Sequence, residues 1–141
     1  MSNAIVAENY IRGGASCRVH YPAFIREIAM TNNHPFHLAA WAKRGDSILY
    51  GVNSSRCSTG FKRVYKGGQV GYQTHAEMAL LKKCKDSNID TVYVIRFRKN
   101  GGITMARPCN YCQTFLRKYG IKKAYYTDWM GEWSLLKLKD A

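Results

Sequence analysis

Residues 91–127, TVYVIRFRKNGGITMARPCNYCQTFLRKYGIKKAYYT, contain the pattern that decides the fold. The segment Thr91–Phe97 is rich in β-branched and aromatic side chains, which favours a strand. The sequence NGG at 100–102 then predicts a turn before Ile103–Ala106. The stretch therefore begins as sheet and reverses direction before its central cysteine pair.

A helix is expected after Pro108. The apolar residues Tyr111, Phe115 and Leu116 recur there at helical spacing. Gly120 is a natural C-cap, because glycine adopts the left-handed conformation at low cost. The sequence therefore predicts a strand, a turn and a helix in that order.

Two strands are expected after this helix, at Lys123–Thr127 and Glu132–Leu138. The four residues Asp128–Gly131 join them. This connection is too short for a crossover helix, so the two strands are predicted to be antiparallel neighbours.

The N-terminal side is interpreted from the same periodicities. The predicted elements are a helix at Tyr21–Met30, a hairpin of Phe36–Ala42 and Ser47–Val52, a surface loop at Ser54–Tyr72, and a helix at His75–Lys83. Residues 1–20 show no clear period and are taken as a poorly specified N-terminal arm, followed by a single domain at 21–141. The element order predicts an α/β layered domain around a five-stranded sheet.

The composition is that of one globular domain, with 141 residues, 46% hydrophobic and 22% charged. No apolar run is long enough to cross a bilayer, and the first residues lack the features of a secretory signal. Five cysteines at irregular spacings favour reduced thiols or metal ligands over a disulfide framework. We therefore expect a cytoplasmic protein, with the nucleus as an alternative, that is not secreted and does not bind a membrane.

Basic residues outnumber acidic ones by 22 to 9, which gives a formal net charge of +13. Such an excess attracts polyanions or phosphorylated substrates. Within the predicted surface loop, residues 56–67 (RCSTGFKRVYKG) are strongly basic. This loop is the candidate contact for an anionic partner.

Two short clusters carry the chemistry, and each lies at the start of a predicted helix. His75 and Glu77 open one helix, and Cys109 and Cys112 open the other. The two cysteines are three residues apart, so both thiolates face one side of a helical turn, where the helix dipole favours their deprotonated form. With the imidazole of His75 they predict a catalytic zinc site, one ion per chain, whose fourth position is left for water. Glu77 stays off the metal and is expected to carry protons to and from that water.

Each part of this pattern also has a structural interpretation. A CxxC pair occurs in redox proteins and structural zinc sites, and Thr74 with Glu77 fits a helix capping box. Cys57 or Cys84 as a fourth ligand would indicate a structural zinc site, but Cys57 is in the predicted loop and Cys84 lies two turns from His75. The conjunction of H-A-E at one helix start with P-C-x-x-C at another favours catalysis.

At these residues the sequence resembles the cytidine and deoxycytidylate deaminase superfamily, whose fold is a three-layer α/β arrangement with a five-stranded mixed sheet and helices on its faces. The resemblance covers about Phe36–Leu138: HAEMALL and PCNYC match the zinc motifs, and FHLAAWAKRGDSILYGVN resembles the first hairpin. It implies that the strand at Ala39 passes under the substrate base and that Asn53 contacts the sugar. Ala76, beside the metal ligand, is a further predicted substrate contact. The family commonly completes its sites across subunits, which makes a homo-oligomer a candidate assembly.

Two features distinguish the chain within this superfamily. The predicted antiparallel ending resembles free-nucleoside cytidine deaminases and several polymorphic toxin deaminases rather than deoxycytidylate or tRNA adenosine deaminases. However, the glutamate that follows the asparagine motif in nucleoside enzymes is missing, and Ser54, Ser55 and Arg56 stand there instead. A basic residue at this point suits a phosphate, so Arg56 is predicted to contact the substrate.

We therefore predict zinc-dependent hydrolytic deamination of cytosine to uracil in a cytidine or deoxycytidine nucleotide or nucleoside. A zinc-bound hydroxide would attack C4, with Glu77 as the proton shuttle. A second interpretation is a cytosine deaminase acting on single-stranded DNA or RNA, which loop 56–67 would hold. A remote third is an inactive zinc-binding interaction module. The sequence leaves open ribose against deoxyribose and cytosine against adenine.

Overall fold

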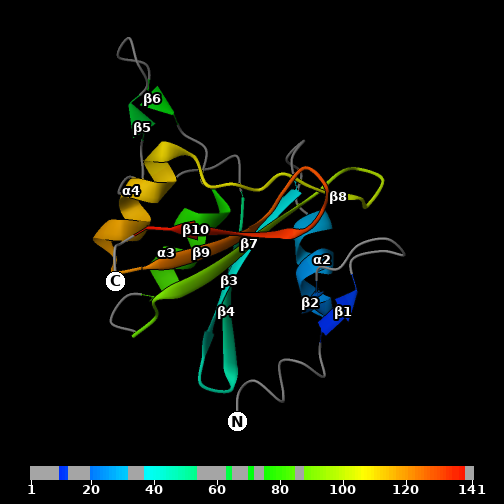
Figure 1. The fold of residues 1–141 in the computed structure, drawn as a ribbon, viewed down its shortest axis with the longest axis horizontal. Coiled ribbons are helices and arrows are strands. Elements are labelled where there is room, and N and C mark those ends of the chain that lie inside the picture. The colour runs from blue at the N-terminus through cyan, green and yellow to red at the C-terminus, as the bar shows by residue number, and fades with distance from the viewer. Residues whose placement is uncertain are drawn as a thin grey trace.

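A mixed β-sheet forms the centre of the molecule (Figure 1). In this computed structural model the described residues are 10–12, 20–31, 37–53, 63–64, 70–71, 75–84 and 88–138. The strand order is β10-β9-β7-β3-β4, and the short β8 pairs with the end of β7 that β9 does not reach. The bounds are β3 His37–Arg44, β4 Ser47–Val52, β7 Thr91–Phe97, β8 Ile103–Thr104, β9 Lys123–Thr127, β10 Trp133–Lys137, α2 Ala23–Met30, α3 Ala76–Cys84 and α4 Asn110–Lys118.

The sheet is parallel at one pair of strands. β7 and β9 run parallel, and every other neighbouring pair in the described part of this sheet is antiparallel. In the β9–β10 pair, Trp133 lies opposite Thr127 and Lys137 opposite Lys123. The predicted α/β class and the antiparallel ending are thereby confirmed.

Two apolar clusters lie on opposite faces of the sheet. In β3, Ala40 and Ala42 belong to the cluster that includes α3 and α4, whereas Ala39 and Trp41 belong to the cluster that includes α2. Successive side chains of a strand point to opposite faces, which produces this division. Figure 1 shows α3 and α4 on one side of the strands and α2 on the other.

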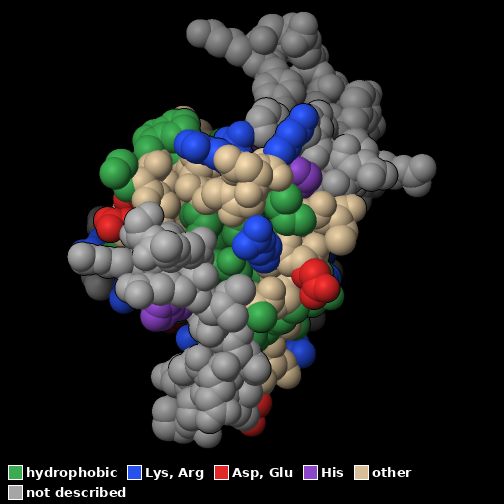
Figure 2. All heavy atoms as spheres, turned by 90° about the vertical axis from the view of Figure 1, so that its right-hand side faces the viewer, with side chains coloured by type: hydrophobic (Ala, Val, Ile, Leu, Met, Phe, Trp, Pro, Cys, Tyr) green, Lys and Arg blue, Asp and Glu red, His purple; other side chains and the backbone are tan. Residues whose placement is uncertain are grey.

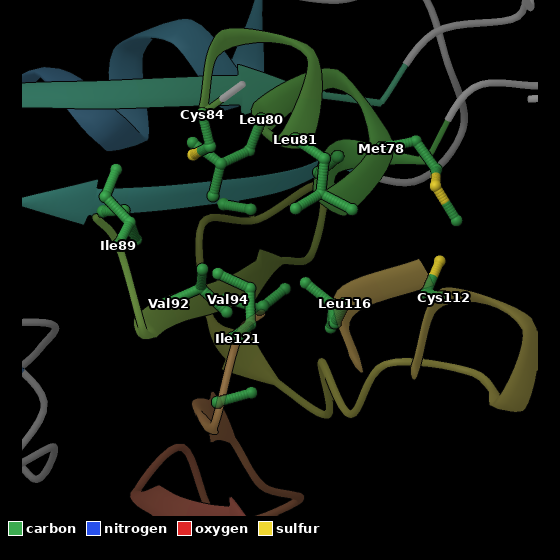
Figure 3. Close-up of a cluster of buried hydrophobic side chains, with 14 of the residues drawn as sticks. Met78, Leu80, Leu81, Cys84, Ile89, Val92, Val94, Cys112, Leu116 and Ile121 are labelled. Atoms are coloured by element: carbon green, nitrogen blue, oxygen red, sulfur yellow. The ribbon is translucent and has the colours of Figure 1, made fainter. Parts of the chain in front are cut away.

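The cluster under α3 and α4 attaches both helices to the same strands. Figure 3 shows Leu80 and Leu81 of α3 and Leu116 of α4 directed toward Val92 and Val94 of β7. All five side chains are fully buried. The positions of the two helices relative to each other are therefore set by one shared core.

Helix α3 lies very close to β4 at Gly51. A Cβ atom added to Gly51 would lie 2.5 Å from the backbone nitrogen of Leu80 and 2.7 Å from the Cβ of Ala79. Glycine is required here because the two backbones approach each other, not because of a special backbone angle. This close approach positions the helix that follows His75.

The helices are short and end as their sequences suggest. α2, α3 and α4 contain 8, 9 and 9 residues. Just after α4, Gly120 adopts a φ of 88°, and its N–H donates to the carbonyl of Arg117, so the predicted C-cap is confirmed. None of the helices in the described ranges is both long and apolar enough to span a membrane.

Two short strand pairs were not predicted. β1 (Tyr10–Arg12) pairs with β2 (His20–Pro22), where the sequence indicated an arm without pattern, so α2 begins at Ala23 rather than two residues earlier. β5 (Arg63–Val64) pairs with β6 (Val70–Gly71) inside the predicted surface loop. Strands of two or three residues are too short to show an alternating period, which explains both omissions.

Candidate metal and active site

The candidate site lies at one edge of the sheet. β3 is antiparallel to both β4 and β7, and β9 is parallel to β7, so β4, β7 and β9 end at the same edge. α3 and α4 begin near this edge, which is the upper one in Figure 1. Open α/β sheets bind their ligands at such an edge, outside the carboxyl ends of the strands.

Three metal-binding side chains meet there. His75 directly precedes α3, Cys109 is the N-cap residue of α4, and Cys112 lies in the first turn of α4. The Nδ1 atom of His75 is 3.3 Å from the Sγ of Cys112 and 3.8 Å from the Sγ of Cys109. The three potential ligand atoms all lie within 4.8 Å of one another. The structure thus brings together the three residues predicted to bind zinc.

The cluster is buried on one side and open on the other. Cys112 is fully buried, His75 is half-buried, and Cys109 is exposed. Figure 3 shows the side chain of Cys112 directed toward Met78 of α3, so the buried end of the cluster is continuous with the core. Within the described residues, Cys109 is therefore the most accessible member of the cluster.

The Cys109 thiol is strongly acidified in this setting. A hydrogen bond with Cys112 lowers its pKa to about 3, and a hydrogen bond with His75 acts in the same direction against the opposing effect of burial. A thiol with such a pKa is a thiolate at neutral pH. Thiolate is the form of cysteine that binds metal ions.

Glu77 lies two residues after His75 and is only 3% exposed. Its Oε1 atom is the one buried side-chain polar atom of the described residues that lacks a hydrogen-bond partner. Burial raises the pKa of its carboxyl above the ordinary value, although a backbone hydrogen bond and the charge of His75 lower it in part. A buried carboxylate oxygen without a partner destabilises a fold, so this oxygen is a cost to stability in the structure.

The donor set fits a catalytic zinc ion. One imidazole and two thiolates match the ligands that zinc prefers, and a catalytic zinc leaves a fourth position open. Cys84 is buried elsewhere, and within the described ranges no other His, Cys, Asp or Glu joins the cluster. Cys57 lies outside the described residues. The described part of the chain therefore offers three ligands, with the unpartnered Glu77 oxygen nearby.

Two of the predicted substrate contacts, Ala76 and Asn53, are buried residues. Ala76 is fully buried between His75 and Glu77. Asn53 is buried just after β4, where its Oδ1 accepts the N–H of Leu38 at 3.0 Å.

Of the other two predicted contacts, Ala39 lies within the described residues and Arg56 does not. The side chain of Ala39 packs in the apolar cluster that includes α2, on the face of the sheet away from Cys112. Its neighbour Leu38 is the residue that packs toward α3. Arg56, like Thr74 of the suggested capping box, lies outside the described residues.

Sequence reasoning missed Gln113. This residue is 6% exposed, and its Nε2 donates to the carbonyl of Pro108 at 2.8 Å. It thereby holds the turn that presents Cys109. The sequence feature that could have identified Gln113 is its position as a polar residue beside the apolar stripe of α4.

Two hydrogen bonds connect the loop before Cys109 to β9. The N–H of Ala106 donates to the carbonyl of Thr127 at 2.8 Å, and the hydroxyl of Thr127 donates to the carbonyl of Thr104 at 2.6 Å. Thr127 itself is fully buried. The loop that leads to Cys109 is thus fixed at both ends.

The fold and this site together define a zinc-binding domain of the hydrolytic deaminase class. The sequence profile described as "Cytidine and deoxycytidylate deaminase zinc-binding region" matches residues 26–128. The chain therefore belongs to this family.

Two solved structures are similar to this chain in fold. Cytidine deaminase from Burkholderia pseudomallei is similar with a TM-score of 0.56 and 14% identity, over 98% of this chain and 93% of that one. Cytidine deaminase from Mycobacterium leprae is similar with a TM-score of 0.51 and 17% identity, over 80% and 89% of the two chains. At such identities the likeness concerns the fold alone. A search of curated proteins found no significant match.

Proposed function

We propose that the protein hydrolyses the exocyclic amine of cytosine in a cytidine or deoxycytidine nucleotide or nucleoside. The observation that carries this proposal is the buried carboxyl of Glu77, whose Oε1 lacks a partner among the described residues, beside the ligand cluster. A purely structural metal site has no use for such a group. A proton carrier needs one.

In this proposal His75, Cys109 and Cys112 hold one zinc ion per chain. Bound zinc supplies Lewis acidity and lowers the pKa of a water molecule toward neutrality. The chain's own contribution is proton transfer. Glu77 accepts one proton from water and passes it to the ring nitrogen N3, then accepts the second from the hydroxyl group formed at C4 and passes it to the departing amine. Water adds at C4, the bond from C4 to the exocyclic nitrogen breaks, and the products are uracil and ammonia.

Burial of Glu77 is suited to this task. Because burial raises its pKa, the protonated form is easier to reach than for a carboxyl in water. The same group can therefore accept a proton early in the reaction and donate it later. Asn53 and Ala76 are proposed to contact the substrate, and Ala39 could do so only through its backbone, because its side chain packs on the other face.

The decisive experiment is a substrate panel. Purified zinc-loaded protein is incubated with cytidine, deoxycytidine, their phosphates, and single- and double-stranded oligonucleotides, and uracil is measured by mass spectrometry. Formation of uracil by the wild type but not by Glu77→Gln is expected. Turnover by Glu77→Gln at the wild-type rate would refute the proposed role, and no uracil from any substrate would refute the proposed function.

A polynucleotide substrate is the second candidate. The observation that favours it is the net charge of +13 on 141 residues. Figure 2 shows Lys and Arg side chains along the upper edge of the face that it displays. The predicted basic loop 56–67 lies almost wholly outside the described residues, so this candidate rests on the net charge.

A further inference from the structure

The turn between β9 and β10 presents two large apolar side chains to solvent. Trp129 is 66% exposed and Met130 is 81% exposed, the highest values among the large hydrophobic residues of the described ranges. Most aromatic residues in the described ranges instead belong to the two apolar clusters or pack against them, as the fully buried Trp41 does. Exposed apolar groups of this kind are typical of binding surfaces.

Hydrogen bonds fix the backbone of this turn. The backbone conformation therefore holds the two side chains in their exposed positions. The Oδ1 of Asp128 accepts the N–H of Met130 at 2.9 Å and the N–H of Glu132 at 3.0 Å, and its Oδ2 accepts the hydroxyl of Ser134 at 3.3 Å. Gly131 has a φ of 75°, as a tight turn requires. The negative charge of Asp128 is therefore engaged by donors of the turn itself.

The turn lies at the same edge of the sheet as the candidate site. β9 ends at Thr127, which is hydrogen-bonded to Ala106, and Ala106 precedes Cys109 by three residues. These chain segments can separate Trp129 from Cys109 by at most about 25 Å. A single-stranded substrate of a few nucleotides spans such a distance.

The segment that leads to Cys109 carries a positive charge. Arg107 is exposed, and its guanidinium carbon is 5.9 Å from the centre of the Tyr126 ring. Tyr126 packs against the cluster that includes α3 and α4, so Arg107 lies on the same face of the sheet as the ligand cluster. Trp129, Arg107 and Cys109 therefore belong to chain segments that meet at one edge of the sheet.

We propose that this edge is a subsite for a further nucleotide: Trp129 stacks on a base within a few nucleotides of the reacting cytosine in a single-stranded polynucleotide, and Arg107 meets a phosphate of the backbone between them. An indole face stacks on any base, and a cation beside it suits the backbone. The net charge of +13 favours this polyanion over an apolar protein partner. The inference rests on the proposed deamination, takes the second candidate substrate, a polynucleotide, and adds a subsite for it.

The test compares Trp129→Ala and Trp129→Phe with Tyr119→Ala. Tyr119 is a matched control, because it is an aromatic residue 38% exposed just after the far end of α4. Each zinc-loaded protein is assayed on cytidine and on a single-stranded oligonucleotide that contains one cytosine. Trp129→Ala should lower kcat/KM on the oligonucleotide about 10-fold and leave cytidine unchanged, and Trp129→Phe should restore most of the loss. Tyr119→Ala should change neither.

A binding measurement separates this inference from the proposed function. Anisotropy of a labelled oligonucleotide should show weaker binding to Trp129→Ala than to Tyr119→Ala, even if no substrate is turned over. Equal binding by these two variants, or an equal loss on cytidine and oligonucleotide, would overturn the proposal. It would also fall if the wild type deaminates cytidine but no oligonucleotide. A change of oligomeric state in Trp129→Ala, with oligonucleotide activity intact, would assign the turn to contact between copies and overturn it too.

Discussion

The two faces of the central sheet share their strands but differ in the size of their side chains. The face toward α3 and α4 carries Ala40, Ala42 and Ala124, whereas the face toward α2 carries Trp41, which stacks on Tyr93 with ring centres 5.4 Å apart. Small side chains let two helices lie close to the sheet, so that their first residues can meet at one edge. Large rings fill the space where one short helix packs. The candidate site and the large buried aromatic rings thus lie on opposite sides of the same strands.

The largest effect is expected at the start of α3. Glu77→Ala should lower kcat about 10²- to 10⁴-fold while the protein keeps its zinc, because it removes a proton carrier and no ligand. The free energy of unfolding should change little, because relief of the unpartnered Oε1 offsets the loss of the remaining hydrogen bonds of the carboxyl and the cavity that is left. Activity assays and metal analysis check this, with the exposed Glu27→Ala on α2 as control. Loss of zinc in Glu77→Ala would show that the carboxyl supports the metal instead.

Removal of a ligand should affect both metal and fold. Cys109→Ser should lose most of the bound zinc and with it the stabilisation that zinc gives to the two helix starts. Metal analysis and thermal melting with and without added zinc measure both effects. Cys84→Ala is the control, because Cys84 is buried in the same core but lies outside the ligand cluster. If both variants lost zinc equally, the assigned ligand set would be wrong.

A substitution on the face of the sheet toward α2 should lower the stability of the protein and leave its activity unchanged. Trp41→Ala removes a fully buried ring that also meets Trp133 edge-on at 5.7 Å. It should lower the free energy of unfolding by about 3–5 kcal/mol, while the folded fraction retains zinc and its kcat. Urea unfolding gives the first quantity and metal analysis the second. Leu135→Ala on β10, where the side chain is 43% exposed, should cost much less. Zinc lost from folded Trp41→Ala would mean that the two faces are coupled.

The smallest expected effect tests the close approach of α3 to the sheet. Gly51→Ala places a methyl group against the backbone of α3 and should destabilise the fold by about 1–3 kcal/mol. Because α3 directly follows His75 and contains Glu77, a drop in kcat should accompany the loss of stability. Ser47→Ala, at the exposed start of β4, is the control. A stable, fully active Gly51→Ala would show that the position of α3 does not need this contact.

Much of the fold was predictable because its signals are local. The strands Ser47–Val52, Thr91–Phe97 and Lys123–Thr127 have the bounds that their residue types predicted. Their patterns span five or more residues, enough to show β-propensity or a period. β1 and β2 contain three residues each and could not be recognised in this way.

The face on which Ala39 lies was not predictable. The run from Leu38 to Ala42 is apolar throughout, so no alternation of polar and apolar residues marks one face. Pairing with β4 and β7 settled the orientation, and it directed Ala39 toward α2. A resemblance between aligned residues does not reveal which face a side chain occupies when both faces are buried.

The sequence by itself predicted the three candidate ligands, which the structure brings together, and the antiparallel pairing of the last two strands. The spacing of Cys109 and Cys112, the start of a helix at His75 and the short β9–β10 connection are local features that need no distant partner. Only the tertiary structure decided that the Glu77 oxygen is buried without a partner among the described residues, that Gln113 holds the turn before Cys109, and that Trp129 is exposed. Burial and hydrogen bonding depend on groups that come from far along the chain, and these groups become neighbours only when the sheet and its helices assemble.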